Sequence, residues 1–498
     1  MEFKIKKNVA EDIISNLPDC ILHHILSFIP TKHVVTMSAL STKWRDISNL
    51  HLTHTTNLDF GEEFMKGQSQ SEFTESLNKI LALHVAKKIE KFHILFDPTN
   101  MFQLETKEWI QFATSSRSVK ELNLDFRREL SYNFDNKLHS PEKIVTLPNF
   151  LFDCKSLTHL SLSHCDLGLP ENFSGLRHLQ TLCLRNIHIL PSQLQNLLSQ
   201  CQLLESLVLG ECDHLYYIKI PASCFRLKYL SLFNCLNANE IEISAPNICR
   251  FLLCRTVMDI FTFNNISSLE EALIGVSRNR YSKTKDIHMA VLASASHVKV
   301  LTIYGGSLLM CHLLEEFPVT FHNLLELQLV NRPGRYDIFS ADIYLFFKHC
   351  SCPLLESLSI ELPHPPPECV HPSRLESARP NVESVDCDFN HLKTIKISNF
   401  KGTDTEINLI IFFLEKAIFL ESLVVVGSQS YHSTDKENPM NKSLEDIRER
   451  LFQLPKASLN IQIVFCEYSE HDDISLTCLE KHDIANQTHQ LPSYFEFD

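Results

Sequence analysis

The first stretch that decides the fold of this chain reads Leu17-Pro18-Asp19-Cys20-Ile21-Leu22-His23-His24-Ile25-Leu26-Ser27-Phe28-Ile29-Pro30. Pro18 suits the first turn of a helix, where its missing N–H costs nothing. From there apolar residues recur at helical spacing and predict one apolar face, formed by Ile21, Leu22, Ile25, Leu26 and Ile29. Pro30 ends this helix, because a proline disfavours the helical conformation of the residue before it.

The residues that follow predict two more short helices. Thr31 can cap one that carries Val34 and Val35, and Ser41 can cap another that carries Trp44 and Ile47. Together the three helices form a compact unit of roughly forty residues, a size that buries too little apolar surface for independent stability. We therefore expect part of its apolar surface to need a partner.

This unit resembles the F-box of plant F-box proteins that carry leucine-rich repeats. The matching elements are Leu17-Pro18, the run Ile21/Leu22/Ile25/Leu26, Phe28-Ile29-Pro30-Thr31, and Leu40-Ser41 followed by Trp44-Arg45. Two positions depart from the family: His33 stands where an acidic residue is frequent, and Ile47-Ser48 replaces a frequent Leu-Trp ending. Neither change removes an apolar residue of the predicted face.

The resemblance implies that the unit docks onto a Skp-family adaptor, which links it to the cullin and RING proteins of a ubiquitin ligase. The residues that it assigns to adaptor binding are Leu17, Pro18, Ile21, Leu22, Ile25, Leu26, Ile29, Val34, Val35, Leu40, Ser41, Trp44 and Arg45. The alternative is an ordinary helical hairpin that packs on the rest of the chain.

After these helices the chain repeats the pattern L-x-x-L-x-L, for example at Leu157/Leu160/Leu162 and Leu179/Leu182/Leu184. From Leu157 onward the first copies start 22, 25, 23, 21 and 21 residues apart, within the range of roughly 20 to 29 residues typical of leucine-rich repeats. Later intervals of up to 37 residues indicate irregular loops or a missed copy. Each L-x-L predicts a short strand that buries its leucines only when neighbouring repeats stack.

Cysteines recur within these repeats at one position. Cys165, Cys212 and Cys235 each follow the last leucine of their copy by three residues, where the repeat pattern places Asn or Cys inside a turn. We expect these three side chains to have a structural role.

The chain then resembles the FBD region of plant F-box proteins, on His391–Ile397, Phe400–Thr403, Leu420–Val425 and Ile461–Phe465. The predicted fold class is α/β: a three-helix F-box, then a leucine-rich-repeat solenoid (horseshoe), then an FBD-like cap. The expected boundaries are 8–56 for the F-box, 57–118 for atypical first repeats, 119–385 for the repeats, 386–466 for the FBD-like region and 467–498 for a polar tail.

Composition narrows the function. The chain has 46 Lys and Arg against 60 Asp and Glu, a net charge of −14, which argues against broad binding of nucleic acid phosphates. Neither a secretory signal nor a membrane span is apparent. The 17 cysteines are best explained as reduced thiols, so we expect the cytoplasm or the nucleus.

No catalytic pattern stands out. The sequence lacks a glycine-rich phosphate loop, a G-x-S-x-G elbow and an H-E-x-x-H motif. Cys350 and Cys352 with His349, and Cys369 with His371, have residue types suited to zinc, but their spacing is not that of a zinc site. We expect no cofactor, no metal and no enzymatic activity.

Recognition is therefore the expected chemistry. Side chains alternate along a strand, so alternate positions of each repeat form one outward face. Among them Tyr229, Phe233 and Tyr304 are the aromatic candidates for substrate binding. The leading hypothesis is a substrate-recruiting subunit of an SCF-type ubiquitin ligase. The alternatives are a Skp-binding module that delivers no substrate and a receptor that needs a small-molecule ligand.

Overall fold

A computed structural model describes residues 14, 16–96, 103–116, 118–127, 145–254, 256, 258–264, 266–275, 285–304, 308, 319–331, 340–363, 389–428 and 444–466. These ranges do not include the expected tail 467–498, residues 8–13, Cys369 or His371. The chain divides into two compact units, residues 1–212 and residues 213–498.

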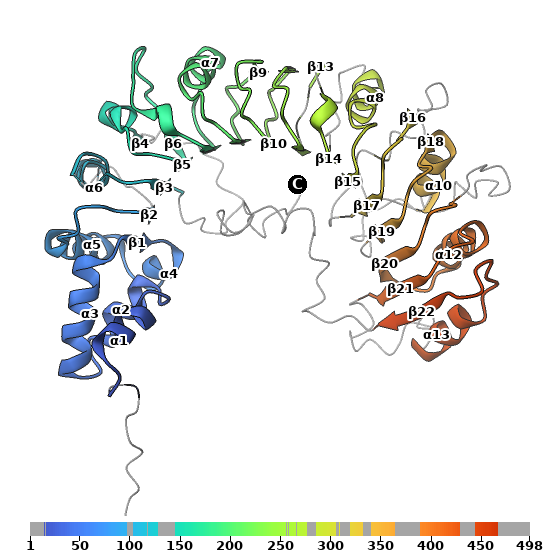
Figure 1. Cartoon of the computed structure of the whole chain (residues 1–498), viewed down its shortest axis with the longest axis horizontal. Coiled ribbons are helices and arrows are strands. Elements are labelled where there is room, and N and C mark those ends of the chain that lie inside the picture. Colours follow the sequence, from blue (N-terminus) through green and yellow to red (C-terminus); the bar gives the residue numbers. More distant parts are fainter. Residues whose placement is uncertain are drawn as a thin grey trace, which may run out of the picture. The chain divides into compact units, whose positions relative to one another are not determined.

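Three short helices open the first unit (Figure 1): α1 (Asp19–Leu26), α2 (Thr31–Met37) and α3 (Thr42–His54). The three predicted helices are confirmed, but two of their starts were wrong. Pro18 and Pro30 precede α1 and α2 in an extended conformation, so Thr31 is the first residue of α2 and not its cap. Ser41 caps α3 as predicted, because its Oγ accepts the Trp44 N–H at 3.2 Å.

The helices share a small apolar core. Its buried members are Leu22, Leu26, Val34, Trp44 and Ile47, and Leu17, Ile25, Ile29, Met37 and Leu52 pack against them half-buried. Each helix contributes at least one buried side chain, so the three helices stabilise one another.

The strands of the first unit form a parallel sheet in the order β1-β2-β3-β5-β7-β8. Their bounds are β1 (Asn57–Phe60), β2 (Lys91–Leu95), β3 (Glu121–Asp125), β5 (His159–Ser163), β7 (Thr181–Arg185) and β8 (Ser206–Gly210). Two shorter strands, β4 (Val145–Thr146) and β6 (Cys165–Asp166), pair separately. The sheet thus begins at Asn57, at the start of the range 57–118 expected for atypical first repeats.

Helical segments link these strands, and Figure 1 shows α5, α6 and α7 on one side of the sheet. They are α4 (Glu62–Met65), α5 (Gln70–Leu83), α6 (Gln103–Ser116), η1 (Asn149–Asp153), η2 (Leu176–His178) and α7 (Pro191–Gln200). Within the atypical first repeats the sequence predicts a helix from Ser76 to Phe92; the observed α5 starts earlier, at Gln70, because Ser69 and Glu72 form a capping box there.

Register explains the repeat pattern. The pattern leucines of neighbouring strands are partners, as in Leu160↔Leu182↔Leu207 and Leu162↔Leu184↔Leu209. All six of these side chains are at most 1% exposed. Each strand is also tied to the next at its start, because one carbonyl accepts two N–H groups: Thr158 O accepts from Gln180 N at 2.8 Å and Thr181 N at 3.0 Å.

The turns that follow the strands are equally regular. His164, Asn186 and Asn234 lie in the left-handed region with φ of 58°, 47° and 54°. The N–H of each donates to the last carbonyl of the next repeat's strand, at 2.8 to 3.0 Å. The structural role of the nearby cysteines is confirmed: Cys165, Cys212 and Cys235 are buried, and the Cys212 thiol donates to the Gly210 carbonyl at 3.3 Å.

The second unit repeats the design. Its large parallel sheet contains β10 (Tyr229–Phe233), β12 (Arg250–Cys254), β14 (Glu271–Gly275), β15 (Val300–Tyr304), β17 (Glu326–Val330) and β19 (Ser357–Glu361). The smaller strands are β9 (Tyr217–Ile220), β11 (Glu240–Ile243), β13 (Ile260–Phe263), β16 (Val319–Thr320) and β18 (Cys350–Ser351), with β9, β11 and β13 in one sheet. The helical segments are η3 (Ile266–Ser268), α8 (Lys285–Ser294) and α10 (Ser340–His349).

Strand pairing shows whether the long later intervals of the repeat pattern contain irregular loops or a missed copy. β14 pairs directly with β15, β15 with β17, β17 with β19, and β19 with the next long strand. The extra residues are therefore insertions between neighbouring strands, among them α8 and α10, and no copy was missed there.

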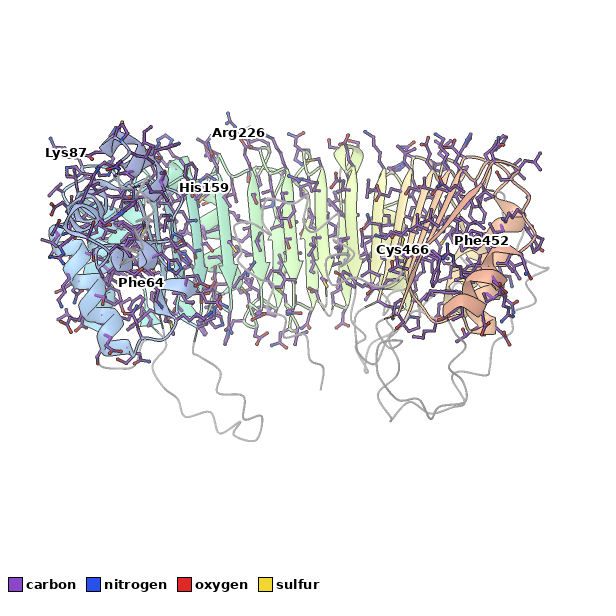
Figure 2. All side chains as sticks on the ribbon, turned by 90° about the horizontal axis from the view of Figure 1, so that it is seen from below. Phe64, Lys87, His159, Arg226, Phe452 and Cys466 are labelled. Carbon is purple, nitrogen blue, oxygen red and sulfur yellow. The ribbon has the colours of Figure 1, made fainter. Side chains whose placement is uncertain are left out.

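The FBD-like region ends the same sheet with elements in the order strand, helix, strand, helix, strand. Its elements are β20 (Thr394–Phe400), α12 (Asp404–Lys416), β21 (Ser422–Gly427), α13 (Leu444–Phe452) and β22 (Gln462–Cys466). Buried aromatic rings of α10 and α12 form its core: Tyr344 lies edge-on to Phe412 at 5.1 Å, and Phe347 to Phe413 at 5.8 Å. Cys466, labelled in Figure 2, ends β22.

Taken across both units, no helix of the described ranges is long and apolar enough to cross a membrane.

Candidate docking and recognition surfaces

The residues assigned to adaptor binding fall into two groups in the structure. Five of the apolar ones remain half-buried or exposed on α1 or within three residues of its ends: Leu17, Pro18, Ile21, Ile25 and Ile29. Ile21 is 44% exposed, and it lies one helical turn from Ile25 on the same side of α1. Val35 on α2 and Leu40 after it are 40% and 67% exposed.

The other assigned residues comprise four buried apolar side chains and two exposed polar ones. Leu22, Leu26, Val34 and Trp44 are at most 6% exposed and form the core that holds the helices together. Ser41 and Arg45 are exposed, and the Ser41 hydroxyl is occupied as the cap of α3. A unit this small needs its own core, so its regularly spaced apolar residues cannot all bind a partner.

Sequence reasoning left out the most exposed apolar residue of this region. Phe28 is 76% exposed and lies directly after α1. Its ring lies edge-on to His24 at 4.9 Å. The signal was present, because Ile21, Ile25 and Phe28 follow one another at intervals of four and three residues. We call Pro18, Ile21, Phe28, Val35 and Leu40 the exposed apolar set.

The start of α1 is held in place by α3. The Lys43 ammonium donates to the Leu17 carbonyl at 3.3 Å and lies 3.8 Å from the Asp19 carboxylate. Because Lys43 precedes Trp44 on α3, these contacts connect the start of α1 to the helix that carries the buried tryptophan.

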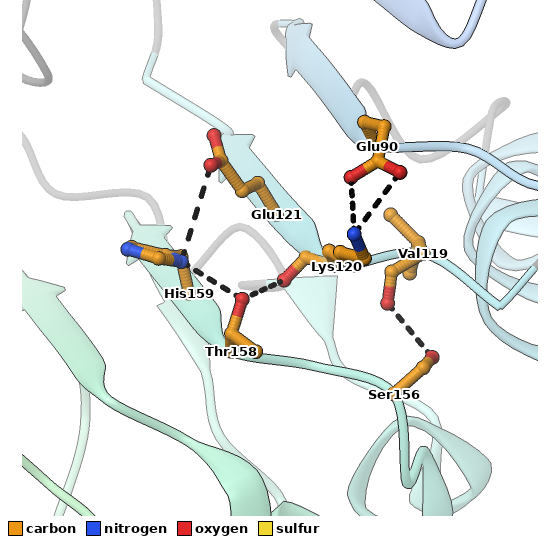
Figure 3. A network of polar contacts seen from close by, with 7 residues as sticks. All are labelled: Glu90, Val119, Lys120, Glu121, Ser156, Thr158 and His159. Carbon is orange, nitrogen blue, oxygen red and sulfur yellow. Dashed lines mark hydrogen bonds and ion pairs between the residues drawn. The ribbon is translucent and has the colours of Figure 1, made fainter.

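A second candidate surface is the strand face of the first unit, which carries polar side chains. Figure 3 shows its edge where β2, β3 and β5 begin: Lys120 pairs with Glu90 at 2.7 Å, and Ser156 donates to the Val119 carbonyl at 2.8 Å. Thr158 Oγ1 lies 2.9 Å from His159 Nδ1, and the same nitrogen is 4.0 Å from Glu121. His159 is half-buried on β5 and is labelled in Figure 2.

Imidazole–carboxylate pairs recur on this face. His93 Nδ1 lies 2.8 Å from Asp59 on the neighbouring strand, and the Gly61 N–H donates to the same oxygen at 3.0 Å. Burial disfavours ionisation of Asp59, but the hydrogen bond from His93 and its charge outweigh that effect, so the pKa of Asp59 lies below its ordinary value.

Asp125 shows the same balance at the end of β3. Burial opposes its ionisation, while the His164 ring at 3.3 Å and the Arg127 guanidinium at 2.7 Å favour it. The net effect lowers the pKa of Asp125. Arg127 also donates its backbone N–H to Asp125 at 3.1 Å, so the carboxylate holds the chain as it leaves the strand.

The three aromatic candidates for substrate binding lie on β10 and β15 of the second unit. Tyr229 is only 4% exposed, and the Arg250 guanidinium lies 5.6 Å from the centre of its ring. Its contact with Arg250 on the neighbouring strand was not visible from sequence, because it depends on the strand register.

Phe233 and Tyr304 are half-buried and lie toward the same edge of the sheet. Phe233 is the partner of Cys254, and Cys254 is the partner of Gly275. Tyr304 lies over Gly275: a Cβ there would be 3.1 Å from both Cβ and Cδ2 of the tyrosine. The missing side chain of Gly275 therefore makes room for the Tyr304 ring.

Other outward positions of the second unit turn out to be buried. Ser231, Thr302 and Gln328 are at most 6% exposed, although they alternate with the pattern leucines. Thr302 donates to Gln328 at 3.3 Å, and Gln328 donates to Glu326 at 2.6 Å. Alternation along the strand is confirmed there, but exposure of these positions was a wrong expectation.

The cysteines considered for zinc are placed as follows. Cys350 and Cys352 are buried, and burial raises the pKa of Cys350 to about 12. Within the described ranges no three His, Cys, Asp or Glu side chains gather in a way that could hold a metal ion.

Comparison with known proteins agrees with this architecture. Residues 14–55 match the F-box domain model, and residues 68–469 match the model of the At1g61320/AtMIF1 LRR domain. Similar proteins come from Arabidopsis thaliana. The FBD-associated F-box protein At4g10400 is 31% identical over 61% of this chain and 70% of its own length. The F-box/LRR-repeat protein At3g59200 is 27% identical over 88% and 86%. The F-box/FBD/LRR-repeat protein At1g13570 is 25% identical over 92% and 99%.

Proposed function

Because the chain belongs to the plant F-box/leucine-rich-repeat proteins, we propose that it is the substrate-recruiting subunit of an SCF-type cullin-RING ubiquitin ligase. Its N-terminal helices would bind a Skp-family adaptor, and its strand faces would hold a protein substrate near the ubiquitin-charged enzyme. The chain would supply position and no catalytic group, and it would act in the cytoplasm or the nucleus.

The exposed apolar set carries this proposal. Phe28, Leu40 and Ile21 leave between 44% and 76% of their surface in water, although Leu22, Leu26 and Val34 of the same three-helix unit are at most 1% exposed. Covering a Leu, Ile or Phe side chain completely contributes about 1.5–3 kcal/mol. An adaptor groove that takes up an amphipathic helical face would recover that energy.

Adaptor capture by the full chain tests this proposal. The double variant Ile21→Ala/Leu40→Ala removes two exposed side chains and leaves the core residues in place. We expect its affinity for a Skp-family adaptor to fall by about thirtyfold or more, since two partly exposed side chains together contribute roughly 2–4 kcal/mol. The matched control is Leu354→Ala/Ile418→Ala, whose side chains are 40% and 48% exposed in the second unit. If the Ile21→Ala/Leu40→Ala variant and the control variant bind the adaptor with equal affinity, docking through these helices is contradicted.

Substrate delivery needs a separate test, because adaptor binding alone also fits a module that recruits nothing. Proteins that co-purify with the chain can be added to a reconstituted ligase containing the adaptor, the cullin and the RING protein. The proposal expects at least one of them to be ubiquitinated only when the chain is present. Partners that bind and are never modified would favour the non-ubiquitinating module.

Phe233 and Tyr304 are our proposed contacts for that substrate. Both are half-buried aromatic residues of the second unit, and aromatic side chains tend to dominate interface energies. We expect Tyr304→Ala to weaken substrate binding by about tenfold while adaptor affinity stays unchanged. Tyr216→Ala, which removes a tyrosine that is 58% exposed outside the large sheet, serves as the control.

A further inference from the structure

Two histidines face each other between α1 and α3. The rings of His23 and His51 are stacked, with their centres 6.0 Å apart and their planes inclined by 23°. Both side chains are half-buried. His23 lies two residues after Ile21 on α1, so the helix that carries one member of the exposed apolar set also carries one half of the pair.

Among the described residues no acidic side chain pairs with either ring, and neither ring forms a hydrogen bond with another side chain. The charged and titratable groups on the surrounding helices have other partners or are exposed. On α1 and α2, Asp19 lies near Lys43, His24 contacts Phe28, and Lys32 donates to the Lys66 carbonyl, while His33 is exposed. On α3 and α5, His54 contacts Leu50 and Thr53, Glu72 bonds to Ser69, and Glu75 pairs with Lys79, while Arg45 and Asp46 are exposed.

We propose that the stacked pair His23 and His51 makes the N-terminal helices acid-sensitive, so that mild acid loosens α1 from α3 and weakens adaptor docking. This inference rests on the proposed function for its second half, the effect on docking. Its first half, the loosening of the helices, concerns the chain alone.

The physical reason is repulsion between like charges. An imidazole takes up a proton near pH 6.5, and two charged rings in contact repel each other where no carboxylate compensates. Burial lowers the pKa of His51, and the charge of His23 lowers it further. The folded state therefore binds protons less readily than the unfolded state. Stability is unaffected well above pH 6.5 and decreases as the pH falls below it.

The test compares full-length wild type, His51→Gln and the control His33→Gln at about pH 7.5 and about pH 5.8. His33 is exposed on α2 and contacts no other ring in the described structure. Thermal unfolding reports on the helices, and titration with a Skp-family adaptor reports on docking. His23→Gln serves as a second variant if His51→Gln does not fold.

We expect wild type and His33→Gln to lose about three- to tenfold in adaptor affinity at the lower pH, and His51→Gln to lose clearly less. The fall in melting temperature should be smaller for His51→Gln in the same way. An identical pH response in all three proteins would overturn the inference. If none of them binds the adaptor at either pH, the proposed function fails, and the melting comparison alone decides whether the pair is acid-sensitive.

Discussion

The N-terminal helices and the strands of the first unit use large apolar residues in opposite ways. In the strands the pattern leucines are buried to within 1%, since each faces a partner leucine on the next strand. In the helices Leu22 and Trp44 are buried to a similar degree, yet Phe28, Leu40 and Ile21 stay in water. Buried leucines explain a fold. The exposed ones of the N-terminal helices are those that the proposed adaptor would cover.

The first test of this difference between helices and strands removes a residue from the core of the N-terminal helices. Trp44→Ala should destabilise the N-terminal helices by about 3–5 kcal/mol, because it removes the largest side chain of their shared core. Adaptor binding should be lost as a consequence. The free energy of unfolding is measured by chemical denaturation, monitored with a spectroscopic probe placed in the N-terminal helices. Arg45→Ala, which changes an exposed neighbour, is the control. Retained stability together with lost binding would instead assign Trp44 to the interface.

The second test removes a strand leucine. Leu182→Ala should cost about 2–5 kcal/mol of stability, since Leu182 is fully buried between Leu160 and Leu207. Urea unfolding measures the loss, and Thr181→Ala on the same strand is the control. Adaptor affinity at low temperature should remain that of wild type. A matching loss of adaptor affinity would show that the strands and the helices do not have separate roles.

The third test concerns a charged group of the strand face. Hydrogen bonds to a charged group contribute about 1.5–3 kcal/mol, and Asp125 accepts them from Arg127 and His164. Its folded pKa lies below the ordinary 3.8, so this stability is present above that value and is lost as the pH falls through the folded pKa.

Asp125→Asn should therefore be less stable than wild type at neutral pH, and the difference should shrink in acid. Unfolding measured from about pH 7 to about pH 2.5 would show this convergence. Glu121→Gln, a more exposed carboxylate on the same strand, should change the profile less. A constant difference across the whole range would contradict the assigned contacts.

Much of the fold was predictable from the sequence because its signals are local or periodic. Helical spacing and prolines gave three helices, and the regular intervals of L-x-x-L-x-L gave parallel strands. The errors have physical causes. The start of α5 was missed because Ser69 and Glu72 form a capping box outside the apolar pattern. Pro18 and Thr31 were placed one position away from their observed roles, because proline suits both sides of a helix start.

The candidate surfaces were harder to predict. Periodicity identifies which residues are apolar but not which of them a three-helix unit needs for its own core, so Leu22, Leu26, Val34 and Trp44 could not be told apart from Ile21. Tyr229 lies beside Arg250, and Tyr304 lies over Gly275, because of strand register. These contacts join residues more than twenty positions apart, and no local pattern encodes them.

The most direct measurement is the adaptor affinity of Phe28→Ala beside that of Phe419→Ala in the full-length chain. Both phenylalanines are exposed, at 76% and 60%, but only Phe28 belongs to the N-terminal helices. Calorimetric titration should show that Phe28→Ala weakens binding of a Skp-family adaptor by about tenfold or more, while Phe419→Ala stays within about twofold of wild type. Unchanged affinity in Phe28→Ala, or an equal loss in both variants, would contradict docking through the exposed apolar set.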